Sequence, residues 1–118
     1  ATAAAATAAI QVIEQEPQRR ASLWRNRERL AQGLLRLGFR LAASESPILP
    51  VIIGDPDRAM KLAQALLAQG VYAPAIRPPT VPPATSRIRF TITADHTDEQ
   101  IDRALIAAEQ AGRSINLI

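Results

Sequence analysis

The chain has 118 residues and no cysteine. Its 14 basic residues, of which Lys61 is the one lysine and the rest are arginines, outnumber its 11 Asp and Glu residues. This length suits one compact domain with a modest core. The missing thiols exclude a disulfide scaffold, a thiolate zinc site and a cysteine nucleophile. No apolar run approaches the roughly 20 residues that a membrane-spanning helix needs, so we expect a cytoplasmic protein with no membrane partner.

The sequence pI of about 10.5 raises the question of nucleic acid binding. Half of the arginines fall between residues 19 and 40, interspersed with Glu28 and apolar residues at helical spacing. This pattern is typical of a solvated helix face. The aromatic residues form no cluster with basic residues of the kind that stacks bases. We therefore expect no nucleic acid partner, and a steeply salt-dependent affinity for mixed oligonucleotides would reverse this interpretation.

The first 37 residues predict two helices. Alanines and an apolar stripe favour a helix over residues 1–16, and Pro17 breaks or kinks it. The second helix covers about residues 18–37, where leucines recur on one face, and Gly38 ends it in a left-handed turn. No capping signal precedes the first helix, so we expect that the chain was cut from a longer one.

A strand, a helix and another strand are predicted next. The apolar run over residues 48–53 indicates a short strand, in which Pro50 cannot donate to a ladder and so indicates an edge or a bulge. The following helix begins at Asp55–Pro56, with an N-cap and a proline at the first helical position, and Gly70 ends it. Residues 71–75 predict a second, brief strand.

The last third of the chain begins with a proline-rich loop. Four prolines over residues 76–86 exclude regular structure and make the loop stiff. The clearest strand follows over residues 87–93, with alternate apolar residues on one face and Arg87 and Arg89 on the other. A Thr97–Gln100 capping box begins the final helix.

This order of elements predicts an α/β fold of the two-layer α+β type. We expect a small, mostly antiparallel sheet with helices on one face, preceded by a long helical arm. Residues 1–40 would form the connecting arm and residues 41–118 a small C-terminal α/β domain. The uncovered face carries Arg87 and Arg89 beside the stiff loop, which makes it a candidate anion site.

Few residues have the spacing that catalysis needs. His96 precedes the last helix, where a surface residue of the cap region is favoured over a general base. There is no nucleophile elbow, and the five glycines form no phosphate loop. We expect no catalytic, cofactor-binding or metal-binding residue in this chain.

Residues 75–96, AIRPPTVPPATSRIRFTITADH, closely resemble the C-terminal domain of the α-oxoamine synthases. These are pyridoxal phosphate (PLP) enzymes of fold type I. The run AIRPPTVP is similar to the version found in the 8-amino-7-oxononanoate synthases of biotin synthesis. The similarity extends back through QGVYAPAIR and SPILPVIIG to WRNRERL, and so covers nearly the whole chain.

The resemblance implies a decarboxylative condensation of L-alanine with pimeloyl-CoA, or a pimeloyl carrier protein, to 8-amino-7-oxononanoate in a homodimeric PLP enzyme. It assigns Arg89 to the carboxylate of the amino acid, which a guanidinium can bind bidentately. It places Thr80 near the entrance for the acyl chain and Arg77 towards the acyl substrate, and leaves Arg87 structural. The alternatives are a surface salt bridge for Arg89, a turn for Thr80 and a structural role for Arg77.

The chain also departs from the family pattern. The Schiff-base lysine of the family, which lies in a Ser/Thr-rich motif followed by glycines, has no counterpart here. The histidine that stacks on the cofactor and the aspartate at its ring nitrogen are also missing, and His96 is not that histidine. We therefore expect the isolated chain to bind no PLP and to be inactive, its main partner being the missing catalytic domain.

Two further interpretations stay open at this point. The parent could be another α-oxoamine synthase, of the glycine C-acetyltransferase or 5-aminolevulinate synthase type. Alternatively, the chain could be a free-standing small-molecule binding module.

Overall fold

A computed structural model of the chain describes residues 16–118. The elements in order are α2 (Pro17–Leu37), β1 (Arg40–Leu41), β2 (Ile48–Gly54), α3 (Pro56–Ala68), β3 (Ala75–Ile76), β4 (Ser86–Thr91) and α4 (Asp98–Ser114). Except for Glu16, the helix predicted over residues 1–16 lies outside this range. None of the three described helices is both long and apolar enough to cross a membrane.

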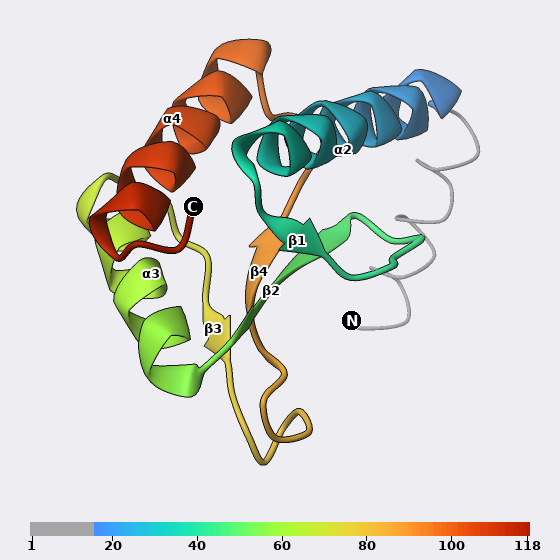
Figure 1. Cartoon of the computed structure of the whole chain (residues 1–118). Coiled ribbons are helices and arrows are strands. Elements are labelled where there is room, and N and C mark those ends of the chain that lie inside the picture. Colours follow the sequence, from blue (N-terminus) through green and yellow to red (C-terminus); the bar gives the residue numbers. More distant parts are fainter. Residues whose placement is uncertain (1–15) are drawn as a thin grey trace, which may run out of the picture.

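The four strands form one antiparallel sheet in the order β1-β2-β4-β3. All three helices lie on the same side of it (Figure 1). Helices α2 and α3 contact the strands, and both also pack against α4. The predicted fold class, a small antiparallel sheet with helices on one face, is therefore confirmed.

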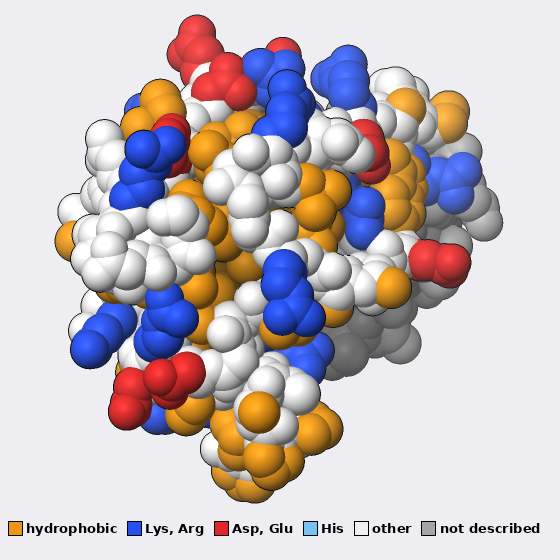
Figure 2. Space-filling view, in the orientation of Figure 1, with side chains coloured by type: hydrophobic (Ala, Val, Ile, Leu, Met, Phe, Trp, Pro, Cys, Tyr) orange, Lys and Arg blue, Asp and Glu red, His pale blue; other side chains and the backbone are white. Residues whose placement is uncertain are grey.

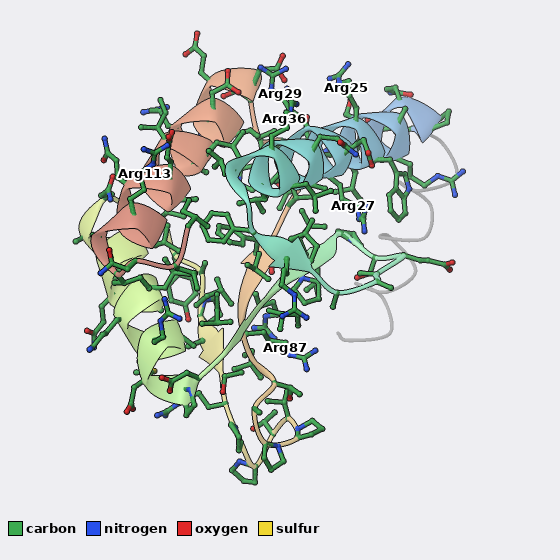
Figure 3. All side chains as sticks on the ribbon, viewed as in Figure 1. Arg25, Arg27, Arg29, Arg36, Arg87 and Arg113 are labelled. Atoms are coloured by element: carbon green, nitrogen blue, oxygen red, sulfur yellow. The ribbon has the colours of Figure 1, made fainter. Side chains whose placement is uncertain are left out.

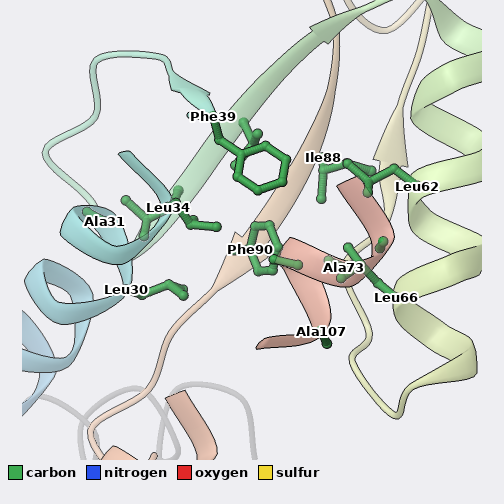
Figure 4. Packing of buried hydrophobic residues seen from close by; sticks show 14 of the residues in the cluster. Leu30, Ala31, Leu34, Phe39, Leu62, Leu66, Ala73, Ile88, Phe90 and Ala107 are labelled. Carbon is green, nitrogen blue, oxygen red and sulfur yellow. The ribbon is translucent and has the colours of Figure 1, made fainter. Parts of the chain in front are cut away.

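The core lies between the sheet and the helices. Alternate residues of the two central strands are buried, because successive side chains of a strand point to opposite faces. Leu49 and Val51 of β2 and Ile88 and Phe90 of β4 are at most 6% exposed. They pack with helix residues that are also buried, namely Leu30, Leu34, Leu62, Leu66, Ile101 and Ala107 (Figure 4).

Local signals in the sequence set the helix ends as predicted. The Asp55 carboxylate accepts a hydrogen bond from the Asp57 N–H at 2.9 Å and caps α3. Thr97 and Gln100 form the reciprocal capping box of α4. Gly38 follows α2 with φ +106°, a left-handed conformation that costs glycine little.

The strand boundaries differ from the prediction in three places. The short strand β1 was not predicted, and its two residues pair with β2. Residues 71–75 were predicted as a strand, but only Ala75 of them pairs with β4, in a strand that continues to Ile76. The reason is that the Val71 N–H donates to the Leu66 carbonyl and completes the end of α3, so the chain reaches β4 only afterwards.

The third difference concerns β4, which covers residues 86–91 instead of 87–93. The loop predicted over residues 76–86 is correspondingly shorter, since Ile76 and Ser86 belong to strands. Ile92 nevertheless stays buried, and its N–H donates to the Pro47 carbonyl at 3.2 Å.

Candidate anion-binding site on the open face of the sheet

The face of the sheet opposite the helices carries the arginines predicted to bind an anion. Arg89 pairs with Pro50, and Arg87 pairs with Ile52. Their neighbours along the strands point into the core, so these side chains point to the other side. Ile76 of β3 also pairs with Arg87. We call this surface the open face.

Arg40 of β1 lies on the same face. It pairs with Ile52, while the next residue, Leu41, packs against the core. One row across the four strands therefore contains Arg40, Ile52, Arg87 and Ile76. Sequence reasoning missed Arg40, because a strand of two residues has no alternation that would reveal which way a side chain points.

Arg89 has the properties expected of a ligand-binding arginine. Its side chain is exposed, and it makes no ion pair or side-chain hydrogen bond with any other described residue. Its backbone N–H donates to the Pro74 carbonyl at 3.0 Å, which fixes this part of β4 beside the start of β3. The guanidinium is therefore free to donate two parallel hydrogen bonds to a carboxylate.

Arg87 has a different environment. It is partly buried, and its Nε donates to the Thr85 carbonyl at 3.1 Å. This contact holds the end of the proline loop, residues 77–85, on the first residues of β4. Figure 3 shows Arg87 on the side of the strands away from the helices.

Arg77 and Thr80 both lie exposed on the proline loop. The Thr80 N–H donates to the Arg77 carbonyl at 3.1 Å and closes a turn around the cis Pro78–Pro79 bond. Across residues 16–118, no hydrogen bond joins either side chain to Arg89. The structure thus places Arg77 and Thr80 on the loop next to the open face, and Arg89 on the face itself.

A surface hollow on the other side of the sheet is not part of this site. Its volume is about 530 Å³, and it lies at the helix-covered side, between the end of β4, residues 69–72 and the first turns of α4. His96 lines it, and its Nδ1 accepts a hydrogen bond from the Thr93 N–H at 2.9 Å. His96 thus has a partner in the turn before α4, where the sequence places it.

The described residues do not fit a PLP site. A lysine must form the Schiff base, and the lysine of this chain, Lys61, lies exposed in the middle of α3. It is absent from the lining of the 530 Å³ hollow. Among residues 16–118, no group of three or more His, Asp and Glu side chains is placed to hold a metal ion.

The fold has a counterpart in solved PLP enzymes. A serine palmitoyltransferase from S. paucimobilis, solved with a bound PLP–myriocin aldimine, superposes with a TM-score of 0.89 at 36% identity. The match covers 96% of this chain and 29% of that one. The fold therefore defines the class as PLP enzymes of fold type I.

Sequence comparison identifies the family. The model of the family described as aminotransferase class I and II matches residues 1–107, so the chain belongs to this family. A putative 8-amino-7-oxononanoate synthase from Desulforudis audaxviator is 50% identical over 93% of this chain and 28% of its own length. The 8-amino-7-oxononanoate synthase of Symbiobacterium thermophilum is 47% identical over 98% of this chain and 30% of its own.

These comparisons confirm the predicted resemblance to the 8-amino-7-oxononanoate synthases. The chain spans less than a third of the length of either relative.

Proposed function

We propose that this chain is the part of a PLP-dependent C-acyltransferase that binds the carboxylate of the amino acid substrate. The longer enzyme would condense L-alanine with pimeloyl-CoA, or a pimeloyl carrier protein, and release carbon dioxide to give 8-amino-7-oxononanoate for biotin synthesis. The names of the relatives support this reaction. The single observation that carries the role of this chain is the exposed guanidinium of Arg89 on the open face, which pairs with no carboxylate among residues 16–118.

Each candidate residue has a separate task in this proposal. Arg89 binds and orients the alanine carboxylate through two N–H donors. Thr80 and Arg77, on the stiff loop, line the path of the acyl chain. Arg87 positions the loop through its hydrogen bond to the Thr85 carbonyl.

The rest of the enzyme supplies what this chain lacks. PLP and its Schiff-base lysine would belong to the missing catalytic domain, where the cofactor acts as an electron sink. Residues 1–40 would connect that domain to the small C-terminal domain at residues 41–118. We further propose that the enzyme is a cytoplasmic homodimer, and that the isolated chain is inactive.

Steady-state kinetics of the full-length enzyme test the role of Arg89. Replacing it in Arg89→Gln removes a charge-assisted hydrogen bond pair, and we expect the KM for L-alanine to rise about tenfold or more. Arg89→Lys keeps the charge without the planar guanidinium, so its KM for L-alanine should lie between those of the unchanged enzyme and of Arg89→Gln. The exposed Arg25 of α2 provides the control, as Arg25→Gln should leave the KM unchanged. An unaltered KM in Arg89→Gln would reject the assignment.

The acyl donor is tested separately from the amino acid. Pimeloyl-CoA is expected to react faster than acetyl-CoA, succinyl-CoA or palmitoyl-CoA in the full-length enzyme. A preference for acetyl-CoA or succinyl-CoA would instead favour the glycine C-acetyltransferase or the 5-aminolevulinate synthase type. The genomic reading frame upstream of Ala1 distinguishes all of these acyltransferases from a free-standing binding module. A frame that continues upstream and encodes a lysine motif supports an acyltransferase, whereas a start codon near Ala1 supports the module.

A further inference from the structure

Several arginines on the helices form ion pairs. On the helices, Arg29 binds Asp102 at 3.0 Å, and Arg113 binds Glu109 at 2.7 Å. The hydrogen bond to Asp102 and the charge of Asp102 raise the pKa of Arg29, and the charge of Asp98 raises it further. Figure 3 shows both arginines on the helical side of the molecule. Carboxylates thus accompany some of the helix arginines, whereas others, such as Arg25, form no ion pair among residues 16–118.

The strands carry arginines without any acidic residue beside them in the strand sequences. Their sequences, RL, ILPVIIG, AI and SRIRFT, contain three arginines and no Asp or Glu. Arg40 and Arg89 are exposed, and neither forms an ion pair with another residue of the described range. In Figure 2, blue side chains lie over the strands without red side chains beside them. The open face therefore has positive charge that the described part of the chain does not neutralise.

The register of the sheet sets the spacing of this charge. Arg40 and Arg87 pair with Ile52 from opposite sides, so their Cα atoms lie two strand spacings, about 10 Å, apart. Arg89 lies two residues along β4 from Arg87, at about 7 Å. The surface between the three guanidinium groups is apolar, because Ile52 and Pro50 occupy it. Two anionic groups joined by a short apolar chain would fit such a surface.

We propose that Arg40, together with the terminal nitrogens of Arg87, forms a second anion subsite on the open face, which binds an acidic group of the acyl donor while Arg89 holds the amino acid. This inference rests on the proposed function. A pimeloyl thioester has a free carboxylate at the far end of its methylene chain, and coenzyme A has phosphates. Both are oxyanions that a guanidinium binds. The subsite would favour a charged acyl donor over an uncharged one.

Arg40 is suited to this role because its exposed side chain makes no hydrogen bond or ion pair with another residue of the range 16–118. It lies on the edge strand of the sheet, and its backbone position follows from the packing of Leu41. Removing its charge should therefore affect ligand binding and leave folding intact. Arg87 is less suitable for a test, since its Nε also holds the proline loop.

Binding measurements on the full-length enzyme test the subsite. Isothermal titration calorimetry with heptanedioate and with its uncharged diamide compares an acidic ligand with a neutral one of the same chain length, and coenzyme A probes the phosphate source. The variants are Arg40→Gln, the charge-conserving Arg40→Lys and the control Arg25→Gln, each checked for an unchanged melting temperature. The KM for L-alanine is measured in parallel, also in Arg89→Gln.

We expect Arg40→Gln to weaken the binding of heptanedioate at least threefold, and to leave that of the diamide and the KM for L-alanine unchanged. Arg40→Lys should retain most of the affinity. If Arg40→Gln weakens the binding of coenzyme A alone, this result would also support the subsite and would identify a phosphate as its ligand. If Arg40→Gln weakens neither heptanedioate nor coenzyme A, the subsite is refuted. If instead Arg89→Gln leaves the KM for L-alanine unchanged, the proposed function fails independently of Arg40.

Discussion

Asn26 is a buried polar residue of α2 that holds the turn between β4 and α4. It is 2% exposed, and its Nδ2 donates to the carbonyls of His96 at 2.8 Å and Thr93 at 3.1 Å, with a longer contact to Ala94 at 3.4 Å. This side chain joins residues that are about 70 positions apart in the sequence. It therefore fixes how β4 leaves the sheet and where α4 begins.

Replacing Asn26 should cost more stability than an average surface substitution. In Asn26→Ala the carbonyls of Thr93 and His96 lose their donor in a buried site, and we expect a loss of about 2–4 kcal/mol in the free energy of unfolding. Urea denaturation measures this value. Gln32→Ala is the control, because Gln32 is exposed and its side chain donates to Glu28 on the same helix. A loss below about 1 kcal/mol would mean that water replaces the amide.

Ser86 presents the reverse situation, a buried hydroxyl without a partner. Its side chain is fully buried at the start of β4, and its Oγ has no hydrogen bond partner among the described residues. Because burying an unsatisfied hydroxyl is unfavourable, Ser86→Ala should leave stability unchanged or raise it by about 1 kcal/mol.

The matched control for Ser86 is Ser44→Ala. The Ser44 Oγ donates to the Ile48 carbonyl at 2.8 Å, so its removal should cost about 1 kcal/mol. Thermal or urea unfolding compares the two variants. A clear loss of stability in Ser86→Ala would show that its hydroxyl has a partner in solution.

At the scale of elements, the close approach of α2 and α4 depends on Gly33. A Cβ atom at this position would lie 2.4 Å from Cδ1 and 2.6 Å from Cδ2 of Leu105. Glycine within a helix is normally unfavourable by about 1 kcal/mol relative to alanine. The contact with Leu105 therefore explains why a glycine is found here in the middle of a 21-residue helix.

This contact makes Gly33→Ala an informative substitution. The overlapping atoms belong to the end of a half-buried leucine that borders a surface hollow, so we expect Leu105 to move and the net loss in unfolding free energy to be about 1 kcal/mol or less. In the background of Leu105→Ala, the same substitution should be neutral or stabilising. Unfolding measurements on the two single variants and the double variant give the coupling energy. Equal effects of Gly33→Ala in both backgrounds would contradict the proposed contact.

The elements also show which parts of the fold the sequence could predict. Helix ends depend on neighbouring residues, so the caps at Asp55 and Thr97 were predicted correctly. Strand ends depend on partners far along the chain. The two residues of β1 become a strand only by pairing with β2, and residues 71–74 fail to form one because Val71 bonds back to α3.

The candidate site follows the same division. The placement of Arg89 could be predicted, since the alternation over β4 places it opposite the core and the family resemblance gives it a ligand. Arg40 could not be predicted, because its position beside Ile52 is set by the register between β1 and β2. The resemblance alone did not indicate it either.

On the scale of the whole molecule, the helices of the described range, residues 16–118, cover one face of the sheet and not the other. In the longer proteins of this family, most of the chain lies outside the segment that matches these 118 residues. The arginines of the open face, which pair with no carboxylate among residues 16–118, would then be neutralised by the proposed ligands or by the rest of the longer protein.

In the proposed function, PLP and its Schiff-base lysine belong to the catalytic domain and not to this chain. We therefore predict that the isolated chain forms no specific PLP adduct. Lys61 lies exposed on α3 without a surrounding site, so it should react with PLP no more readily than free lysine does. Absorbance titration, followed by borohydride reduction and mass spectrometry, measures the adduct. We expect weak labelling that does not saturate at one PLP per chain. Lys61→Met provides the control: a saturable 1:1 aldimine band that this variant loses would show that the chain holds the cofactor by itself.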